Sequence, residues 1–450
     1  MKLIRHAISI LLFFLNPRTW LNWSVSKEKI HNEFYWIWLK YCYYILQKFY
    51  YPRIKNNIAR KLLQNQEIKI AFIVFDTSKW SVDTIYQEFA IKKGFHPVII
   101  VFPDIQFPGG SSESVKYSYA FFEKKGYNVQ YGYNPTANQY LPSKIWKEFD
   151  IVFFDTPWLR KEKTLKIETI GASALTCYIP YGAILAGKIE QEHYNMPNHS
   201  FAWRIFPELA WHKQQYNKHN YLSHDYNVVP LGYPKLDIYS QKLTDPEKVW
   251  KLGLNPNIRR VIWAPHWTIY NVFPPGQFST FHLIYKQMLE YAKNHPEIDW
   301  LFKPHPVLRS TIIAQKLMSE SEVDNYYQQW DCLPNGQVSL DGNFWDYFRT
   351  SDALITDSVS FLVEYLPSKK PIFRIDSGYG SYNEITQQII SNYYTGKTMD
   401  DIIEFIENIV IPENDYLYNE RMKSLKLMQN PGVAGKSIVE YIINTITSEK

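Results

Sequence analysis

The chain has 450 residues, enough for two or three domains with large hydrophobic cores. Hydrophobic residues make up 46% and charged residues 21%, which excludes a disordered chain, and the net charge of +5 falls short of a nucleic-acid-binding footprint. The three cysteines, at positions 42, 177 and 332, have neither disulfide-framework nor metal-ligand spacing, which favours a reducing compartment.

The first 65 residues carry two apolar runs. Residues 7–15 (AISILLFFL) are too few to span a bilayer, and no small-residue cleavage site follows them. Residues 34–51 (FYWIWLKYCYYILQKFYY) are aromatic almost throughout, with Lys40 and Lys48 as their charges. Because Trp and Tyr favour the membrane interface, we expect two interfacial helices that hold the protein peripherally on the cytoplasmic face of a membrane. The alternative is a helical hairpin packed on the rest of the protein.

Residues 66–238 alternate between buried strands and helices. We expect strands at 68–75, 96–102, 127–131, 150–154 and 174–179, a further strand at 227–231, and helices at 82–90 and 115–124. This alternation predicts a parallel sheet with helices on both faces. Ligands of such sheets bind beyond the carboxyl ends of the strands, where the loops here begin at Asp76, Asp155 and Tyr178.

Residues 239–450 contain a second alternating series, so the predicted fold class is α/β with two Rossmann-like domains. Strands are expected at 260–264, 300–303, 353–355 and 371–375. Helices are expected at 280–293, 308–318, 344–349, 358–365, 384–390, 399–406, 418–427 and 436–446, the last of which crosses back to the first domain. The boundary is expected near residues 233–245, at and after the turn GYPKLD (232–237).

Two strands of the second domain end in proline-stiffened turns. Residues 300–306 read WLFKPHP, so Lys303 and His305 project from a strand end at a fixed angle. A cation and an imidazole there can bind a diphosphate and donate a proton to a leaving phosphate. Residues 261–270 read VIWAPHWTIY and present the second set of candidates, His266, Trp267 and Thr268. A packed turn with a solvated histidine remains the alternative for this second stretch.

A third strand end is rich in hydroxyl groups. Residues 351–364 read SDALITDSVSFLVE, an apolar strand followed by a polar turn and a helix start. Unpaired backbone N–H groups at a helix start favour phosphate, although an ordinary Asp or Ser cap has the same pattern. The candidate residues here are Thr356, Asp357, Ser358, Ser360 and Glu364.

In combination and in this order, these motifs resemble the CDP-glycerol glycerophosphotransferase family of teichoic acid and surface-polymer synthesis. The resemblance rests on APHW at 264–267, KPHP at 303–306, SDALITDSVS at 351–360, KKP at 369–371 and GYPKLD at 232–237. It implies a GT-B fold, with two Rossmann-like domains facing across a cleft: an acceptor domain at 66–238 and a donor-nucleotide domain at 239–450. It also implies membrane association and transfer of a polyol phosphate from a CDP-linked donor to a surface-polymer or lipid-linked acceptor.

Carried over by position, the resemblance assigns roles to these residues. His305 would contact the diphosphate and assist the leaving CMP. Lys303, Trp267, Thr268, Thr356, Asp357, Ser358, Ser360 and Glu364 would bind the donor. Trp158, Tyr181 and Gly182 would lie on the acceptor side. No metal and no cofactor is implied.

One stretch departs from the family pattern. Family polymerases carry Trp-His-Gly at the edge of the first domain, with the His as general base, where this chain has Tyr-Ile-Pro-Tyr-Gly at 178–182. A tyrosine is a poor base at neutral pH. The base is then His266, Asp155 or Asp76, or the acceptor differs.

Three functions follow. The first is a CDP-dependent polyol-phosphate transferase, and the second is a glycosyltransferase of the same fold that uses a nucleotide sugar. The third is not an enzyme but a membrane-surface scaffold or lipid-binding protein that kept the fold. The product left by the donor separates the first two, because polyol-phosphate transfer releases CMP and sugar transfer from UDP or GDP releases the diphosphate. Nucleotide binding argues against the third.

Overall fold

The computed structural model describes residues 32–104, 114–158, 162–187, 190–269, 276–340 and 344–448. The predicted helix at 7–15 lies outside these residues. The chain separates into two compact units, each with a sheet of its own. Unit 1 comprises Met1–Gly182, Glu190–Asp237 and Gln429–Lys450; unit 2 comprises Ala183–Ile189 and Ile238–Met428.

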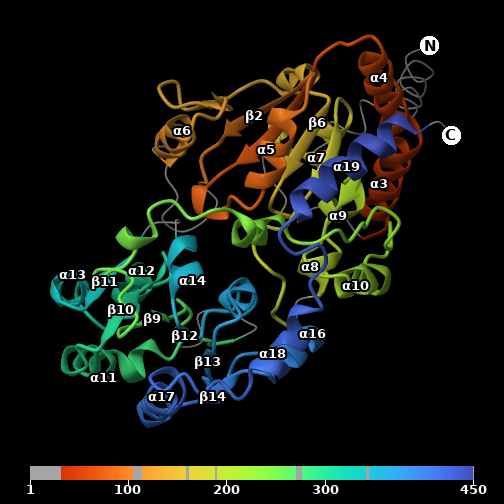
Figure 1. The fold of residues 1–450 in the computed structure, drawn as a ribbon. Coiled ribbons are helices and arrows are strands. Elements are labelled where there is room, and N and C mark those ends of the chain that lie inside the picture. The colour runs from red at the N-terminus through yellow and green to blue at the C-terminus, as the bar shows by residue number, and fades with distance from the viewer. Residues whose placement is uncertain are drawn as a thin grey trace, which may run out of the picture. The chain divides into compact units, whose positions relative to one another are not determined.

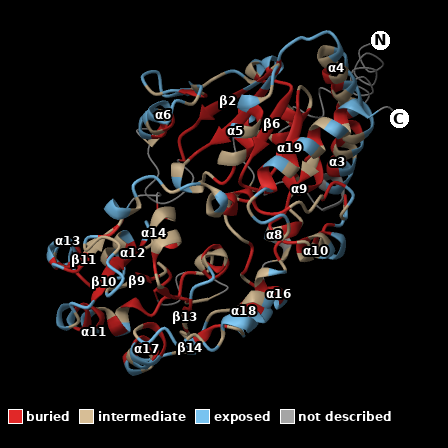
Figure 2. Cartoon of the chain, in the orientation of Figure 1, coloured by how far each residue is buried: buried red, intermediate tan, exposed pale blue. Residues whose placement is uncertain are grey.

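Within the described residues, the main sheet of unit 1 has six parallel strands in the order β3-β2-β1-β6-β7-β8 (Figure 1). This is the strand order of a nucleotide-binding α/β fold, with the chain reversing its direction of travel between β1 and β6. The central strands are buried along nearly their whole length, as their apolar runs predict (Figure 2). The strands are β1 (Ile68–Val74), β2 (Phe95–Val101), β3 (Val129–Tyr131), β6 (Ile151–Phe154), β7 (Leu175–Tyr178) and β8 (Arg204–Ile205).

Helices pack around this sheet, and a small antiparallel pair, β4 (Tyr133–Asn134) and β5 (Gln139–Tyr140), lies outside it. The helices of unit 1 are α3 (Asn32–Ile45), α4 (Tyr51–Leu63), α5 (Asp83–Ile91), α6 (Ser114–Lys124), α7 (Ile167–Gly171), α8 (Glu190–Tyr194), α9 (Pro197–Phe201), α10 (Trp211–His219) and α19 (Ala434–Thr447). The last of these contacts α5 and α4, so the C-terminal end of the chain belongs to unit 1.

The aromatic segment at 34–51 runs through α3, a π-helical turn (Leu46–Tyr50) and the start of α4. One side of it packs on unit 1, where the hydroxyl of Tyr51 donates to the carbonyl of Phe201 at 2.6 Å and bonds the hydroxyl of Thr176 at 2.7 Å. The opposite side is exposed. No helix among the described residues combines the length and apolar character needed to cross a bilayer.

Unit 2 repeats the same strand order. Its six described strands are parallel, in the order β11-β10-β9-β12-β13-β14. They are β9 (Arg259–Ala264), β10 (Ile298–Phe302), β11 (Gly336–Val338), β12 (Ala353–Thr356), β13 (Ile372–Ile375) and β14 (Tyr394–Gly396). The helices are α11 (Phe281–Asn294), α12 (Leu308–Ala314), α13 (Glu320–Cys332), α14 (Trp345–Thr350), α15 (Phe361–Glu364), α16 (Glu384–Ile390), α17 (Met399–Phe405) and α18 (Tyr418–Leu425). The core of this unit is aromatic, with Trp263, Trp300 and Trp330 fully buried.

Two expectations from the sequence were wrong. The predicted strand at 227–231 contributes a single bridge at Val228, and β8 in the polar stretch before it is the sixth strand instead. The predicted helix at 358–365 is reduced to α15, a single turn, because 357–358 are irregular and 359–360 form a turn, with Asp357 bonded to His266 and Thr280 in neighbouring loops. A helix this short has a weak dipole, so the phosphate-binding argument from its N-terminus fails.

The carboxylate of Asp237 connects the place where the chain leaves unit 1 with the segment that returns to it. Asp237, the last residue before the crossing to unit 2, accepts hydrogen bonds from the N–H groups of Ala434 (2.9 Å) and Gly435 (2.7 Å) at the start of α19. It also accepts from the hydroxyl of Thr84 at 2.8 Å. The last residue of the GYPKLD turn therefore bonds α19 and α5 together within unit 1.

Candidate functional site

Three loops of unit 2 meet where the central strands of its sheet end. β9 lies between β10 and β12, and all three are parallel, so the loops that follow them emerge side by side. The N–H of His305 donates to the carbonyl of Pro265 at 3.2 Å, and the N–H of His266 donates to Oδ1 of Asp357 at 2.5 Å. The strand order reverses between β9 and β12, which is where α/β sheets bind nucleotides.

Two histidines face each other across these loops. The rings of His266 and His305 lie 5.3 Å apart, centroid to centroid, and both side chains are half-buried. The ring of Trp267 lies 6.1 Å from that of His305. Lys303 is buried below them, with its ammonium 5.6 Å from the ring centroid of Phe344.

Hydrogen bonds from the protein fix the tautomer of both histidines. The N–H of Thr268 donates to Nδ1 of His266 at 3.3 Å, and the Thr268 hydroxyl, 2.8 Å from the same nitrogen, already accepts from the N–H of Phe278. Nδ1 of His305 accepts from the N–H of Val307 at 3.2 Å. Since each Nδ1 acts as an acceptor, the ring proton sits on Nε2. The pair therefore presents two N–H donors.

Burial keeps both imidazoles neutral. It lowers the pKa of His266 well below the usual value, and the neighbouring His305 lowers it further. Burial, assisted by the positive charge of Lys303, lowers the pKa of His305 to about 3. Two neutral donors close together can bind the oxygens of a diphosphate, whose negative charge would in turn raise both pKa values.

In the polar turn that follows β12, Thr356 and Asp357 use their side chains in hydrogen bonds within the protein. Oδ2 of the buried Asp357 accepts from the N–H and the hydroxyl of Thr280, at 2.7 and 2.9 Å. Burial raises the pKa of Asp357 to about 6, although these bonds and that from His266 oppose the rise. The hydroxyl of Thr356 donates to the carbonyl of Ala264 at 2.6 Å and accepts from the N–H of Ser358 at 2.9 Å. Asp357 and Thr356 thus hold the loops in place.

The other residues of this turn have different surroundings. Ser358 is buried, while Ser360 is half-buried and makes no capping hydrogen bond to α15 with its side chain. Glu364 is fully buried, and its backbone carbonyl accepts from the hydroxyl of Tyr239 at 2.8 Å.

The acceptor-side candidates gather at the strand ends of unit 1. The buried Asp155 follows β6, and its carbonyl accepts from the N–H of Tyr181 at 3.2 Å, with Gly182 next in the chain. The ring of Trp158 lies 6.0 Å from that of Tyr181. Burial, helped by the carboxylates of Asp155 and Asp104, raises the pKa of Tyr181 to about 12. Tyr181 therefore keeps its proton at neutral pH and is no general base.

Sequence reasoning missed an ion pair in the same place. Lys79 and Asp104 form a salt bridge of 2.5 Å, and the ammonium of Lys79 lies 5.7 Å from the ring centroid of Tyr181. Both residues lie in loops that follow buried strands, β1 and β2, and that position was the available signal.

Asp76, the third candidate base, caps a short 3-10 turn by accepting from the N–H of Ser78 at 2.8 Å. No group of three His, Cys, Asp or Glu side chains among the described residues is placed to hold a metal ion.

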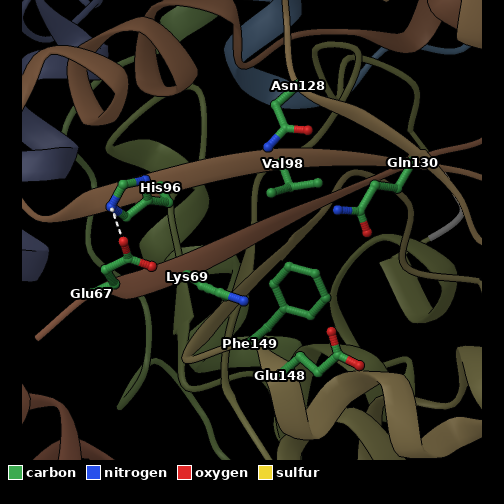
Figure 3. A pocket seen from close by; sticks show the side chains of 8 residues that line it. All are labelled: Glu67, Lys69, His96, Val98, Asn128, Gln130, Glu148 and Phe149. Atoms are coloured by element: carbon green, nitrogen blue, oxygen red, sulfur yellow. Dashed lines mark ion pairs between the residues drawn. The ribbon is translucent and has the colours of Figure 1, made fainter.

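A separate hollow of about 180 Å³ lies at the opposite ends of the strands of unit 1 (Figure 3). His96 and Glu67 form a 3.5 Å ion pair at one side of it. The lining residues are Glu67, Lys69, His96, Val98, Asn128, Gln130, Glu148 and Phe149. Since most are exposed polar side chains on the amino-terminal half of the sheet, this hollow is not part of the candidate site.

A family model described as CDP-glycerol:poly(glycerophosphate) glycerophosphotransferase matches residues 208–444, more than half of the chain. No curated protein matches the chain in sequence.

Solved structures share the fold. A variant of the wall teichoic acid polymerase TagF is 13% identical, with a TM-score of 0.58 and coverage of 99% of this chain and 97% of that one. UDP-GlcNAc 2-epimerase from Neisseria meningitidis, solved with UDP-GlcNAc bound, is 14% identical, with a TM-score of 0.54 and coverage of 84% and 100%. The corresponding epimerase of Methanocaldococcus jannaschii is 12% identical, with a TM-score of 0.50 and coverage of 84% and 99%. At these identities the likeness shows an α/β fold of the GT-B kind.

Proposed function

This chain belongs to the CDP-glycerol:poly(glycerophosphate) glycerophosphotransferase family, and on that premise we propose that it transfers glycerol phosphate or a related polyol phosphate from a CDP-linked donor to a teichoic-acid-like acceptor. Unit 2 holds the donor in this proposal, and unit 1 contributes the acceptor side. As in the GT-B architecture, we propose that the two sides face across a cleft. The observation that carries the proposal is the pair of neutral histidines, His266 and His305, each with an Nε2–H donor, at adjacent strand ends.

The chemistry requires few groups. An acceptor hydroxyl attacks the β-phosphorus, the bond from that phosphorus to the bridging oxygen breaks, and CMP leaves. His266 and His305 hydrogen-bond the diphosphate oxygens, and His305 stabilises the leaving CMP. Lys303 adds positive charge beneath the site, while Thr356 and Asp357 act by positioning the loops.

Other donor contacts are assigned by their place in the fold. We propose that Ser358 and Ser360 line the phosphate side and that Glu364 binds the ribose. Trp267 lies beside His305 and can cover the donor, and Thr268 fixes the tautomer of His266.

Asp155 is the candidate base. His266 is unsuited to that role because its Nε2 carries the proton, and Tyr181 is unsuited because its pKa is about 12. The carboxylate of Asp155 follows β6 beside the backbone of Tyr181, where an acceptor stacked on Trp158 would present its hydroxyl. Asp155→Asn is expected to lower transfer while leaving CDP affinity unchanged.

The test of the function is CMP release from CDP-glycerol and related CDP-polyols in the presence of candidate acceptors. His305→Ala is expected to lower CMP release about a thousandfold, because it removes a donor to the transferring group. His295→Ala, in the same unit but at the opposite end of β10, serves as the matched control. Turnover of the His305→Ala protein near that of wild type would refute the proposal. Release of UDP or GDP from nucleotide sugars in place of CMP would instead establish a glycosyltransferase.

We also propose peripheral membrane binding on the cytoplasmic face. The side of α3 and the π-turn that faces away from unit 1 exposes Trp36, Ile37, Tyr44 and Phe49, with the cations Lys40 and Lys48 beside them. The π-turn places Phe49 5.7 Å from the ring of Tyr44. Aromatic rings with flanking lysines suit a membrane interface.

Cosedimentation with vesicles that contain anionic lipid tests this proposal. The double change Tyr44→Ser and Phe49→Ser is expected to weaken binding by about tenfold through lost apolar burial. Tyr117→Ser, at an equally exposed ring on α6, is the control and should have no effect. Equal binding by all three proteins would count against the membrane surface.

A further inference from the structure

A short segment of the chain leaves unit 1 and becomes part of unit 2. It spans Ala183–Ile189, and we call its described residues, 183–187, the strap. The strap follows Tyr181 and Gly182 directly in the chain. The acceptor-side residues of the proposed function are therefore covalently continuous with a piece of the donor unit.

The strap is held at the N-terminus of α16. The N–H of Asn383 donates to the carbonyl of Leu185 at 2.9 Å, and its side-chain Nδ2 donates to the carbonyl of Ile184 at 2.8 Å. The hydroxyl of Thr386 adds a third bond, to Leu185, at 3.0 Å. The side chain of Leu185 is buried, so the strap packs as part of unit 2 and does not merely cross its surface.

The strap also pairs with the residues that precede Asn383. Ala186 forms an antiparallel bridge with Tyr382, and the N–H of Gly187 donates to the carbonyl of Ser381 at 3.0 Å. A Cβ added at Gly187 would lie 3.0 Å from the carbonyl oxygen of Tyr382. Glycine at position 187 therefore lets the strap lie close to the backbone of Tyr382, and a side chain there would require the two to move apart.

A row of contacts leads from the strap to the donor histidine. The ring of Tyr382 lies 5.3 Å from that of Phe278, which lies 5.7 Å from that of His266. The N–H of Phe278 donates to the Thr268 hydroxyl at 3.0 Å, and this hydroxyl lies 2.8 Å from Nδ1 of His266. A shift of the strap can thus reach the group that fixes the tautomer and position of His266.

We propose that the strap couples occupation of the acceptor side to the position of His266, so that the donor is used for transfer in preference to hydrolysis. In hydrolysis, water attacks the β-phosphorus and gives its proton to the same base, and CMP and free polyol phosphate leave. A strap that shifts against α16 when an acceptor binds would slow this loss, because His266 would reach its working position only then. Asn383, Tyr382 and Phe278 are positioning residues in this scheme, which rests on the proposed function.

Two variants loosen the strap in different ways. Asn383→Asp removes the Nδ2 donor to Ile184 but keeps the side-chain oxygen that caps α16 by accepting from the N–H of Thr386. Gly187→Ala pushes the strap away from Tyr382. Thr398→Ala, which removes the side-chain cap of α17 in the same unit, controls for a general loss of stability.

The readouts are the ratio of transferred product to free polyol phosphate, CDP affinity by calorimetry and the melting temperature. Both strap variants are expected to lower the ratio at least about fivefold, with CDP affinity within about twofold of wild type, and Thr398→Ala to leave the ratio unchanged. A double-mutant cycle of Asn383→Asp with Phe278→Leu should show that the two effects on the ratio are not additive.

The outcomes separate the two proposals. If the wild-type protein releases no CMP from any CDP-polyol, the proposed function fails and the coupling falls with it. If wild type performs transfer but both strap variants keep its ratio, or if CDP affinity falls in step with the ratio, the coupling alone is overturned. Additive effects in the cycle would break the link from the strap to His266.

Discussion

Burial lowers the pKa values of one pair of histidines in unit 1, His199 and His212, and of one pair in unit 2, His266 and His305, and the two pairs differ in what surrounds them. In unit 1, His199 and His212 are fully buried, and burial lowers the pKa of each to about 3. The ring of His199 lies 5.3 Å from that of Tyr178 and 5.4 Å from that of Tyr216, and Nδ1 of His212 lies 3.0 Å from the hydroxyl of Tyr194. These imidazoles are enclosed by other side chains.

In unit 2, burial also lowers the pKa values of His266 and His305, but both lie half-buried at strand ends, with their Nδ1 atoms satisfied by the protein. Their remaining N–H groups are set as donors at a point where α/β sheets bind nucleotides. Nδ1 of His199 likewise accepts from a backbone N–H, that of Met196 at 3.1 Å, so a fixed tautomer is common to both units. The comparison teaches that a lowered pKa reports burial, whereas partial exposure at the strand ends indicates a binding site.

The largest expected effect is that an alanine change in the unit 1 pair lowers stability, whereas one in the unit 2 pair lowers activity. His199→Ala should destabilise unit 1 by about 3 kcal/mol, because it leaves a cavity among aromatic rings, with CMP release per folded molecule unchanged. His305→Ala should instead lower CMP release about a thousandfold with little loss of stability. Urea unfolding and CMP assays on the same preparations make the comparison. A loss of activity in folded His199→Ala protein would erase the distinction.

Stability should fall as the pH is lowered, in both units. All four histidines stay neutral when folded but take up a proton near pH 6.5 when unfolded, so the unfolded state gains protons below that pH. Each histidine is expected to lower the free energy of unfolding by about 1 kcal/mol as the pH falls from about 7.5 to about 5.5. Saturating CDP should offset this loss for unit 2 alone, because a bound diphosphate raises the pKa values of His266 and His305. Equal protection of both units would contradict the comparison.

The smallest expected effect tests the contact between the Thr268 hydroxyl and Nδ1 of His266. Thr268→Val removes the hydroxyl beside Nδ1 of His266 and leaves only the longer bond from the backbone N–H. CMP release should fall about tenfold, near the value of one hydrogen bond. Thr268→Ser keeps the hydroxyl and should restore most of the activity. If valine and serine behave alike, the hydroxyl of Thr268 does not help to hold His266.

The two sheets could be predicted from the sequence because their long central strands are continuous apolar runs bounded by polar turns. β8, β11 and β14 escaped prediction, since strands of two or three residues have little detectable periodicity. The helix α13 was also missed, although Ser319 and Glu322 form a capping box at its start, and that signal is readable from sequence.

Part of the candidate site could likewise be predicted from the sequence, and part could not. Strand-end motifs pointed to the loops of His266, His305 and Asp357, because residues after parallel strands share one edge of a sheet. The tautomers and the engagement of Asp357 with Thr280 depend on side-chain geometry that no spacing encodes. Lys79 and Asp104 each follow a buried strand, which is readable from the sequence, but their pairing across two separate loops depends on the folded geometry.

The anchoring of Asp237 has a consequence for dissecting the protein. Cutting the chain at this residue to isolate the N-terminal half would remove the amide donors of Ala434 and Gly435, leave the hydroxyl of Thr84 as a donor to Asp237, and uncover the faces of α4 and α5 that α19 contacts. To isolate unit 1, residues 429–450 must therefore be kept with it. They can be fused ahead of the aromatic helix α3 in a permuted chain.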